Sequence, residues 1–189
     1  MHQALRAKLE ETLKISDEDW KTFESILYTL EVKKADYILK AGQICNGIYF
    51  LREGAVRTFY LKDGQEINTS FNFENDFLRE IESLANNQPS EKYIQAIENS
   101  KLFYIEKSKL TGLYQQSIFF QELGRRILEQ LAITEQKYSA LLAANSPKER
   151  YLHILENKPE LVHRIPLQHL ASYLGISRES LSRIRKRVS

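Results

Sequence analysis

The sequence has 189 residues, of which 42% are hydrophobic and 28% charged, and its net charge is +2. This length and composition predict one or two globular domains and exclude a disordered chain. The longest uninterrupted apolar stretch, residues 140–144, is far shorter than the roughly 20 residues that cross a bilayer, and the N-terminus has no signal-peptide core. We therefore expect a cytoplasmic protein that makes no use of a membrane.

Cysteine and histidine are too sparse to support metal chemistry. The single cysteine, Cys45, cannot form an internal disulfide or ligate an iron–sulfur cluster or a zinc ribbon. The four histidines lack the spacing of metal ligands. We predict no metal site, no cofactor and a reducing compartment.

The first half of the chain changes from a helical to a strand pattern. Apolar residues recur at three- and four-residue steps up to about residue 30, and Ser16 with Asp19 indicates a helix start there. Short aromatic and β-branched runs follow, separated by turn residues, and Asp63-Gly64 predicts a hairpin. Such runs indicate an antiparallel sandwich or small barrel, with strands at residues 37–39, 48–51, 56–61, 67–73, 93–97 and 102–105.

A long helix is predicted from about residue 108 to Ala144. An a/d seam of a heptad repeat is formed by Phe120, Gly124, Ile127, Leu131, Thr134, Tyr138 and Leu141. We assign the opposite side Leu123, Leu128, Ile133 and Leu142. Two apolar faces are explained if one packs on the barrel and the other on a second subunit, which favours a parallel homodimer. The alternative is a helix that packs only on its own sheet.

A domain boundary is predicted at Asn145-Ser146-Pro147. Ser146 as the cap, proline at the first helical position and Glu149 three residues after the serine form a capping box. Residues 145–189 carry nine Lys and Arg side chains against four Glu, a net charge of +5, whereas residues 1–144 carry −3. This asymmetry indicates that the C-terminal segment meets a polyanion.

The segment "LQHLASYLGISRESLSRI" has the spacing of a helix-turn-helix. Ala171 is small enough for a second helix to cross close above it, and Gly175 can take the left-handed conformation of the turn. Ser177 is placed to cap the second helix. The apolar positions that hold the two helices together are Leu170, Leu174, Ile176, Leu181 and Ile184.

The outward face of the second helix is expected to read DNA. Its residues are Arg178, Glu179, Ser182, Arg183 and Lys186. The N-terminal residues of such a helix reach base edges, and arginine is the commonest reader of guanine. The alternative is a solvated face on which Glu179 and Arg183 form a surface ion pair.

The barrel, the long helix and the C-terminal "SRESLSRIRK" together resemble the cyclic-AMP receptor protein and fumarate–nitrate regulator (Crp/Fnr) family, in particular its short members from the Bacteroidetes. The resemblance implies an α+β fold with three parts. These are a cyclic-nucleotide-binding-like β-roll (a double-stranded β-helix, or jelly roll) with N-terminal helices at residues 1–115, a dimerisation helix at 116–144 and a helix-turn-helix domain at 145–189. The end of the sequence at Ser189 implies that most of the usual wing is absent.

Site residues also follow from the resemblance. It implies base contacts by Arg178, Glu179 and Arg183 in the major groove. Candidates for phosphate contacts are Gln168, Ser177 and Lys186.

The cyclic-nucleotide pocket of the family is altered in this sequence. Glu80 of the family's Gly-Glu-Leu segment is present, but Arg79 replaces the glycine, and Ser90 and Glu91 stand where the phosphate-binding arginine and serine are expected. Loss of the arginine removes a charge-assisted bond, and a carboxylate repels the cyclic phosphate. We therefore expect no cyclic AMP binding, with Lys92 compensating only if the register shifts. The four residues at positions 79, 80, 90 and 91 are the candidate pocket for an unknown small effector.

The sequence is consistent with two classes of function and argues against a third. The first is a homodimeric regulator that binds a palindromic site in double-stranded DNA, for which the resemblance implies recruitment of RNA polymerase. The alternative is a small-ligand sensing or protein-interaction module whose C-terminal helices do not read DNA. An enzyme is not expected, because no nucleophile–base set, paired carboxylates or phosphate loop is present.

Overall fold

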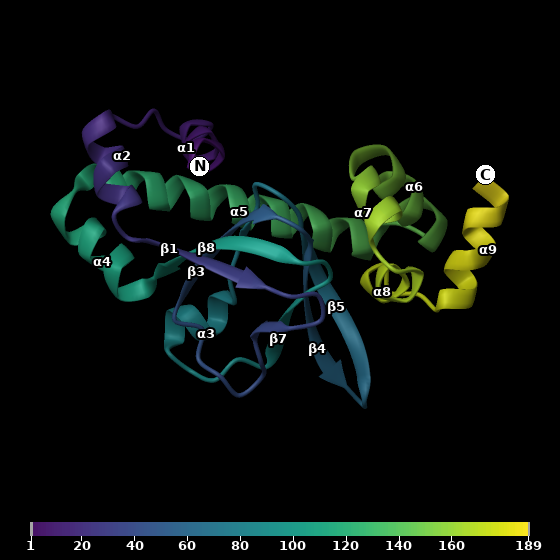
Figure 1. The fold of residues 1–189 in the computed structure, drawn as a ribbon. Helices are drawn as coiled ribbons and strands as arrows, with labels where there is room; N and C mark the ends of the chain where they lie inside the picture. Colours follow the sequence, from purple (N-terminus) through teal and green to yellow (C-terminus); the bar gives the residue numbers. More distant parts are fainter. Residues whose placement is uncertain (1, 189) are drawn as a thin grey trace. The chain divides into compact units, whose positions relative to one another are not determined.

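The computed structural model describes residues 2–188, and the chain divides into two compact units. The first unit is Met1–Arg57 with Asn72–Leu131, and the second is Thr58–Phe71 with Ala132–Ser189. The fold is mixed helix and sheet: a β-roll, a long helix and C-terminal helices (Figure 1), as the sequence predicts. The predicted domain boundaries remain predictions.

The strands form two four-stranded sheets, with the orders β1-β8-β3-β6 and β2-β7-β4-β5. The strands are β1 Leu27–Val32, β2 Tyr37–Leu39, β3 Gly47–Glu53, β4 Val56–Lys62, β5 Gln65–Asn72, β6 Phe77–Leu78, β7 Lys92–Ala96 and β8 Ser100–Glu106. All six predicted strands are confirmed within a few residues. The turn between β4 and β5 has positive φ at Asp63 and Gly64, 52° and 75°, which is the geometry of a tight hairpin.

The prediction of helix up to about residue 30 is wrong in its last part. Helices α1 Gln3–Glu10 and α2 Asp17–Glu24 form, and the Ser16 hydroxyl caps α2 by accepting from the Asp19 N–H at 3.1 Å. Beyond Ser25 the chain becomes β1, which pairs with β8 so that Leu27 lies opposite Ile105. The apolar spacing continues through Leu27, but pairing with a distant strand overrides it.

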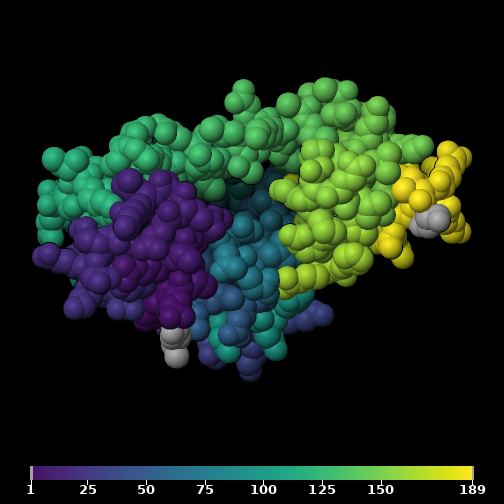
Figure 2. Space-filling view, turned by 90° about the horizontal axis from the view of Figure 1, so that it is seen from above, coloured from purple at the N-terminus to yellow at the C-terminus, as the bar shows by residue number. Residues whose placement is uncertain are grey.

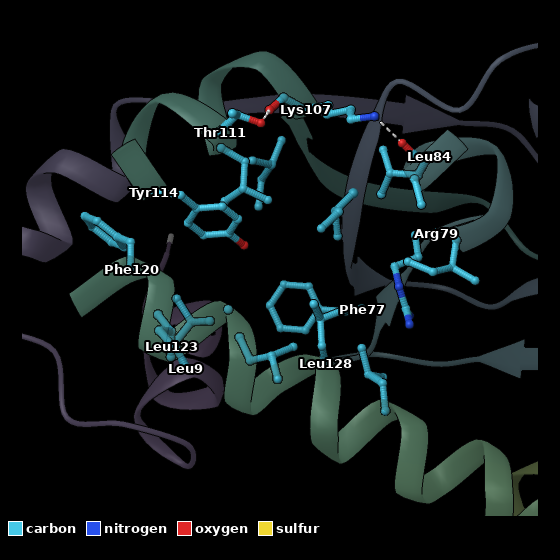
Figure 3. A pocket seen from close by; sticks show the side chains of 18 of the residues that line it. Leu9, Phe77, Arg79, Leu84, Lys107, Thr111, Tyr114, Phe120, Leu123 and Leu128 are labelled. Atoms are coloured by element: carbon cyan, nitrogen blue, oxygen red, sulfur yellow. Dashed lines mark hydrogen bonds between the residues drawn. The ribbon is translucent and has the colours of Figure 1, made fainter. Parts of the chain in front are cut away.

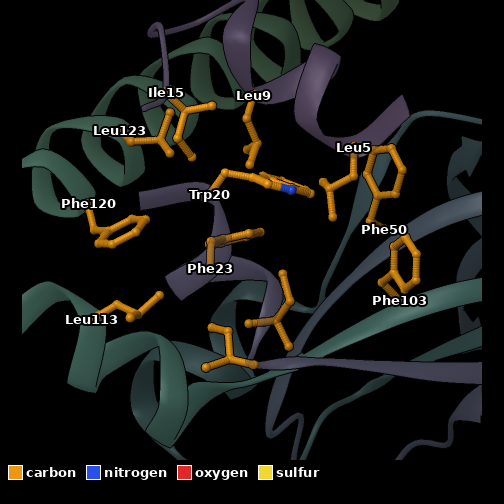
Figure 4. Packing of buried hydrophobic residues seen from close by; sticks show 12 residues of the cluster. Leu5, Leu9, Ile15, Trp20, Phe23, Phe50, Phe103, Leu113, Phe120 and Leu123 are labelled. Atoms are coloured by element: carbon orange, nitrogen blue, oxygen red, sulfur yellow. The ribbon is translucent and has the colours of Figure 1, made fainter. Parts of the chain in front are cut away.

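The central strands of the first sheet bury both faces. Because side chains alternate along a strand, Tyr49 and Leu51 of β3 pack inside the β-roll, whereas Phe50 packs on the helices. Phe50 lies directly opposite Phe103 of β8. The helix side of the sheet is covered by Leu5, Leu9, Trp20 and Phe23 of α1 and α2 together with Leu113, Phe120 and Leu123 (Figure 4). In Figure 2 these N-terminal helices, in purple, lie against the teal-green residues of α4 and the start of α5.

The predicted long helix is interrupted once. Helix α4 runs over Lys107–Gln116 and α5 over Ile118–Ala144, with the extended residue Ser117 between them (φ −144°, ψ 123°). Short helix α3, Ile81–Asn86, precedes β7. The remaining helices are α6 Pro147–Asn157, α7 Pro159–Arg164, α8 Leu167–Tyr173 and α9 Arg178–Val188.

The assignment of Leu123 and Leu128 to the side of α5 opposite the a/d seam is wrong. Leu123 is buried beside Phe120 in one cluster, and Leu128 lines the same cavity as Gly124 and Ile127. At 3.6 residues per turn, residues three or four apart lie on nearly the same face. Ile118 and Ile133, 83% and 46% exposed, are the large apolar residues that stand away from this face.

Candidate nucleic-acid interface

Helices α6 and α7 form the support on which the helix-turn-helix rests. The predicted capping box is confirmed: the Ser146 N–H donates to Glu149 Oε2 at 2.7 Å, and the Glu149 N–H donates to Ser146 Oγ at 3.4 Å. These bonds satisfy two N–H groups at the start of α6 that have no partner within the helix. Tyr151, Ile154 and Leu161 are buried, so both helices present a fixed apolar surface.

The turn between α8 and α9 has the geometry that the sequence predicts. Gly175 lies at φ 68°, in the left-handed region, and the Ile176 N–H donates to the carbonyl of Ala171 at 3.0 Å. Ala171 is 1% exposed, so no larger side chain fits at the crossing. Leu174 and Leu181, both fully buried, hold the two helices together.

Arg150 of α6 anchors this turn, a role that the sequence did not indicate. Its Nη1 donates to the carbonyl of Leu174 at 2.8 Å, and its Nε donates to the carbonyl of Asn145 at 2.9 Å. The guanidinium thereby satisfies a carbonyl at the end of α8 that has no partner within the helix. Only the tertiary fold brings these groups together, because Arg150 and Leu174 are 24 residues apart in the sequence.

The predicted DNA-reading residues lie on the outer side of α9 and on α8. Ser177 caps α9 by accepting from the Ser180 N–H at 3.2 Å, as predicted. The exposed residues are Gln168, Ser177, Arg178, Glu179, Arg183 and Lys186, and Ser182 is half-buried. The fully buried Leu181 fixes which side of the helix faces outward.

The cations of this face are not neutralised within the part of the chain that the structure describes. Arg183 contacts the Ser180 hydroxyl at 3.4 Å rather than Glu179, so the surface ion pair is not formed. Arg178 and Lys186 likewise have no acidic side chain within ion-pair distance among residues 2–188. The face therefore offers three charged donors to an anion.

Residues of the β4–β5 hairpin bind α8 within the second unit, a contact that the sequence did not reveal. The Ser172 hydroxyl accepts from the Asn68 N–H at 3.0 Å and donates to the carbonyl of Glu66 at 2.8 Å. The ring of Tyr173 stacks on Tyr138 of α5 with centroids 4.4 Å apart, and burial raises the pKa of Tyr173 to about 12. These bonds fix α8 against the hairpin.

Glu80 of the candidate effector pocket is already satisfied by protein groups. It is 3% exposed and accepts from the Ser83 N–H at 2.8 Å, the Glu82 N–H at 3.3 Å and Lys92 Nζ at 3.2 Å. Burial raises the pKa of this carboxyl, but the Ser83 and Lys92 hydrogen bonds outweigh it, so the pKa lies below its ordinary value. Glu80 therefore acts as the N-cap of α3.

The other three residues of the predicted effector pocket point to different surroundings. The Ser90 hydroxyl is buried and bonds the N–H and carbonyl of Lys92 at 2.9 and 3.0 Å. Glu91 is exposed, and half-buried Arg79 lines a separate apolar cavity. The structure brings Glu80 and Lys92 together but does not gather residues 79, 80, 90 and 91 around one cavity.

Comparison with known proteins gives relatives of both parts of the chain. Residues 29–117 match the cyclic nucleotide-binding domain family. The anaerobic regulatory protein of Pasteurella multocida is 24% identical over 170 residues, which are 83% of this chain but 61% of that protein, less than two thirds of its length.

Two solved structures share the fold. FixK2 from Bradyrhizobium japonicum is 17% identical, with a TM-score of 0.72 over 86% of this chain and 84% of that one. A chain from Eubacterium rectale, described as a transcriptional regulator of the Crp/Fnr family, is 22% identical, with a TM-score of 0.65 over 92% of this chain and 83% of that one. Among residues 2–188, no helix has the length and apolar character to cross a bilayer.

Proposed function

We propose that the chain is a transcription regulator of the Crp/Fnr type, which its fold and relatives resemble, and that it binds double-stranded DNA in a sequence-specific manner through α9. The observation that carries this proposal is the outward face of α9, on which Arg178, Arg183 and Lys186 are exposed without acidic partners among residues 2–188. Arginine fits guanine in the major groove through two hydrogen bonds. Ser177 and Gln168, which are both exposed, are proposed to contact phosphates.

We further propose that the chain acts as a homodimer on a palindromic site. Helix α5 has 27 residues and carries Leu128, which is 48% exposed. A second α5 packed along this helix would cover apolar surface, and two recognition helices related by a two-fold axis would lie roughly 34 Å apart. The site would then read as two half-sites of opposite orientation.

The sensor part is proposed not to bind cyclic AMP. The carboxylate of Glu80 is occupied by three donors. In the sequence, the acidic Glu91 stands where the family resemblance implies a residue that binds the cyclic phosphate. A nucleotide would therefore have to break protein bonds and meet a like charge. Recruitment of RNA polymerase and the absence of catalysis are part of the same proposal, and rest on the resemblance to the Crp/Fnr family.

The experiment that tests this proposal is selection of bound duplexes from a random DNA pool, with and without cyclic AMP. Enrichment of one palindrome in both arms is the expected result. Enrichment only with cyclic AMP would contradict the proposal that the sensor part does not bind this nucleotide. No enrichment in either arm would contradict DNA reading by this protein alone and favour a protein-interaction module.

A double variant sharpens the selection. Arg178→Ala with Arg183→Ala removes two cations from the reading face, whereas Lys109→Ala with Lys137→Ala removes two exposed cations elsewhere. Loss of enrichment in the first variant and its retention in the second is expected. Equal behaviour of the two variants would show that general charge, and not α9, is responsible.

A further inference from the structure

A cavity of about 310 Å³ lies in the first unit, between the helix side of the sheet and helices α3, α4 and α5 (Figure 3). Its volume is within the roughly 300–1,000 Å³ of small-molecule sites. Glu80, Ser90 and Glu91 of the predicted effector pocket do not line it, so it is a different site. Its apolar wall includes Phe77, Leu84, Leu110, Phe120, Leu123 and Leu128.

The few polar groups of this cavity are mostly donors. Figure 3 shows the Tyr114 hydroxyl pointing into the cavity, and it makes no hydrogen bond to any residue that the structure describes. Burial raises the pKa of Tyr114, so its hydroxyl is a neutral donor at pH 7. The Thr111 hydroxyl donates to the carbonyl of Lys107 at 2.8 Å.

Two cations and no carboxylate line the cavity. They are Arg79 and Lys107, and the lining contains no Asp or Glu. Lys107 Nζ donates to the backbone carbonyl of Leu84 and has no acidic partner among residues 2–188. A carbonyl leaves the ammonium charge uncompensated, so a ligand that brings an anion gains a charge-assisted bond.

We propose that this cavity binds a small carboxylic acid with an unbranched apolar chain, such as a medium-chain fatty acid. The chain would pack against Phe77 and Leu123, and the carboxylate would accept from Lys107 Nζ and the Tyr114 hydroxyl. An apolar wall of this extent excludes a nucleotide or a sugar, whose many polar groups would lose their bonds to water. A neutral apolar ligand would leave the ammonium group of Lys107 without a negatively charged partner.

The position of the cavity also explains how such a ligand acts. Gly124, Ile127 and Leu131 line it from α5. A bound chain therefore touches the helix that the proposed function assigns to dimerisation, so that occupancy would favour one arrangement of two such helices. Only this regulatory role rests on the proposed function, since binding itself requires no DNA.

Titration calorimetry of the full chain with sodium decanoate, without DNA, tests the proposal. One decanoate per chain is expected to bind. Lys107→Met should weaken binding about tenfold or more and Tyr114→Phe about threefold, whereas Lys109→Met, an exposed lysine of the same helix, should bind as wild type. Decanol should bind at least about tenfold more weakly than decanoate.

A series from hexanoate to hexadecanoate provides a second readout. Each added methylene should tighten binding about fourfold until the cavity is full, after which affinity should stop rising. Absence of decanoate binding, wild-type affinity in both Lys107→Met and Tyr114→Phe, or affinity that rises through hexadecanoate would each overturn the proposal. DNA selection is measured separately, so the two proposals fail independently.

Discussion

Arg178 is the first residue of α9, where its exposed side chain reaches away from the protein. A cation at a helix N-terminus opposes the helix dipole, so this residue does not stabilise its own helix. Its presence there is explained by a partner that supplies negative charge or acceptor atoms. The major groove of DNA offers both.

Arg178→Ala is therefore expected to weaken binding to the selected site by about 1–3 kcal/mol and to relax preference at one base pair.

Lys186→Ala should weaken binding to all DNA sequences by a similar factor. It should also reduce the slope of log K for DNA binding against log salt concentration by about 1. Fluorescence anisotropy on the selected duplex and its single-base variants, at several salt concentrations, measures both effects. An Arg178→Ala protein with unchanged preference at each base pair would contradict direct readout by this residue.

Glu80 illustrates a residue that the sequence identifies for one role and the structure uses for another. Its pKa lies below the ordinary value in the folded protein, so the unfolded chain binds more protons in acid. The stabilisation is complete above the ordinary carboxyl pKa of about 4.3 and is lost as the pH falls through the lowered folded-state value.

Glu80→Gln should lower the free energy of unfolding at pH 7 by about 1–2 kcal/mol, because the α3 cap and the bond to Lys92 are weakened. Below pH 4 the difference between the two proteins should shrink. Urea unfolding at pH 7 and pH 3.5 provides the measurement. A difference that persists unchanged in acid would mean that the carboxylate charge contributes nothing.

Most elements were predictable from local patterns, and those that were not depend on distant partners. The Ser16 cap, the Ser146–Glu149 capping box, the Asp63-Gly64 turn and the helix-turn-helix spacing are set by residues a few positions apart, and all are confirmed. Strand β1 follows an apolar spacing that also fits a helix, and β6 has only two residues. Only pairing with β8 and β3 defines them.

The site shows the same division. The spacing of Ala171, Gly175 and Ser177 predicted the turn and the outward face of α9. Arg150 at the turn and Ser172 against the hairpin act through backbone groups 24 and more than 100 residues away, for which no sequence pattern exists. The cavity beside α5 was also missed, because its lining residues read as ordinary core positions.

Gly175 in the turn between α8 and α9 and Gly112 within α4 give a matched test of the helix-turn-helix turn. Gly175 has φ 68°, and a Cβ there would meet Arg150 Nη1 at 3.4 Å, an ordinary contact, so the cost of Gly175→Ala is conformational. We expect destabilisation by about 1–2 kcal/mol and weaker DNA binding. Gly112 lies within α4 with open space around it, so Gly112→Ala should stabilise by about 1 kcal/mol. Thermal unfolding of both variants shows whether backbone strain or steric contact of the added methyl group causes the destabilisation.

At the scale of the whole molecule, charge is concentrated where the proposed partner binds. Residues 145–189 carry +5 although the chain carries only +2. DNA would attract this segment and repel residues 1–144, which carry a net charge of −3. The charge distribution would therefore orient the protein as it approaches DNA and also strengthen binding. A second copy doubles the number of basic segments, which makes the assembly state decisive for affinity.

The homodimer is tested on α5. Leu128 is 48% exposed, and a carboxylate there would be buried without a partner in the proposed interface, which costs several kcal/mol. Leu128→Glu should therefore raise the dimer dissociation constant by about 100-fold or more, as measured by analytical ultracentrifugation against the 22.1 kDa mass of one chain. Its affinity for a full palindrome should fall towards that for a half-site.

Ile118→Glu is the control for this substitution. Ile118 is also an apolar residue of α5 but is 83% exposed at the start of the helix, so its replacement should leave dimer and DNA binding unchanged. If Leu128→Glu remained dimeric while Ile118→Glu became monomeric, the interface would lie on the other side of α5. If wild type itself sedimented as a 22.1 kDa monomer and bound a single half-site, the two-fold arrangement would be wrong, whereas DNA reading by α9 would stand.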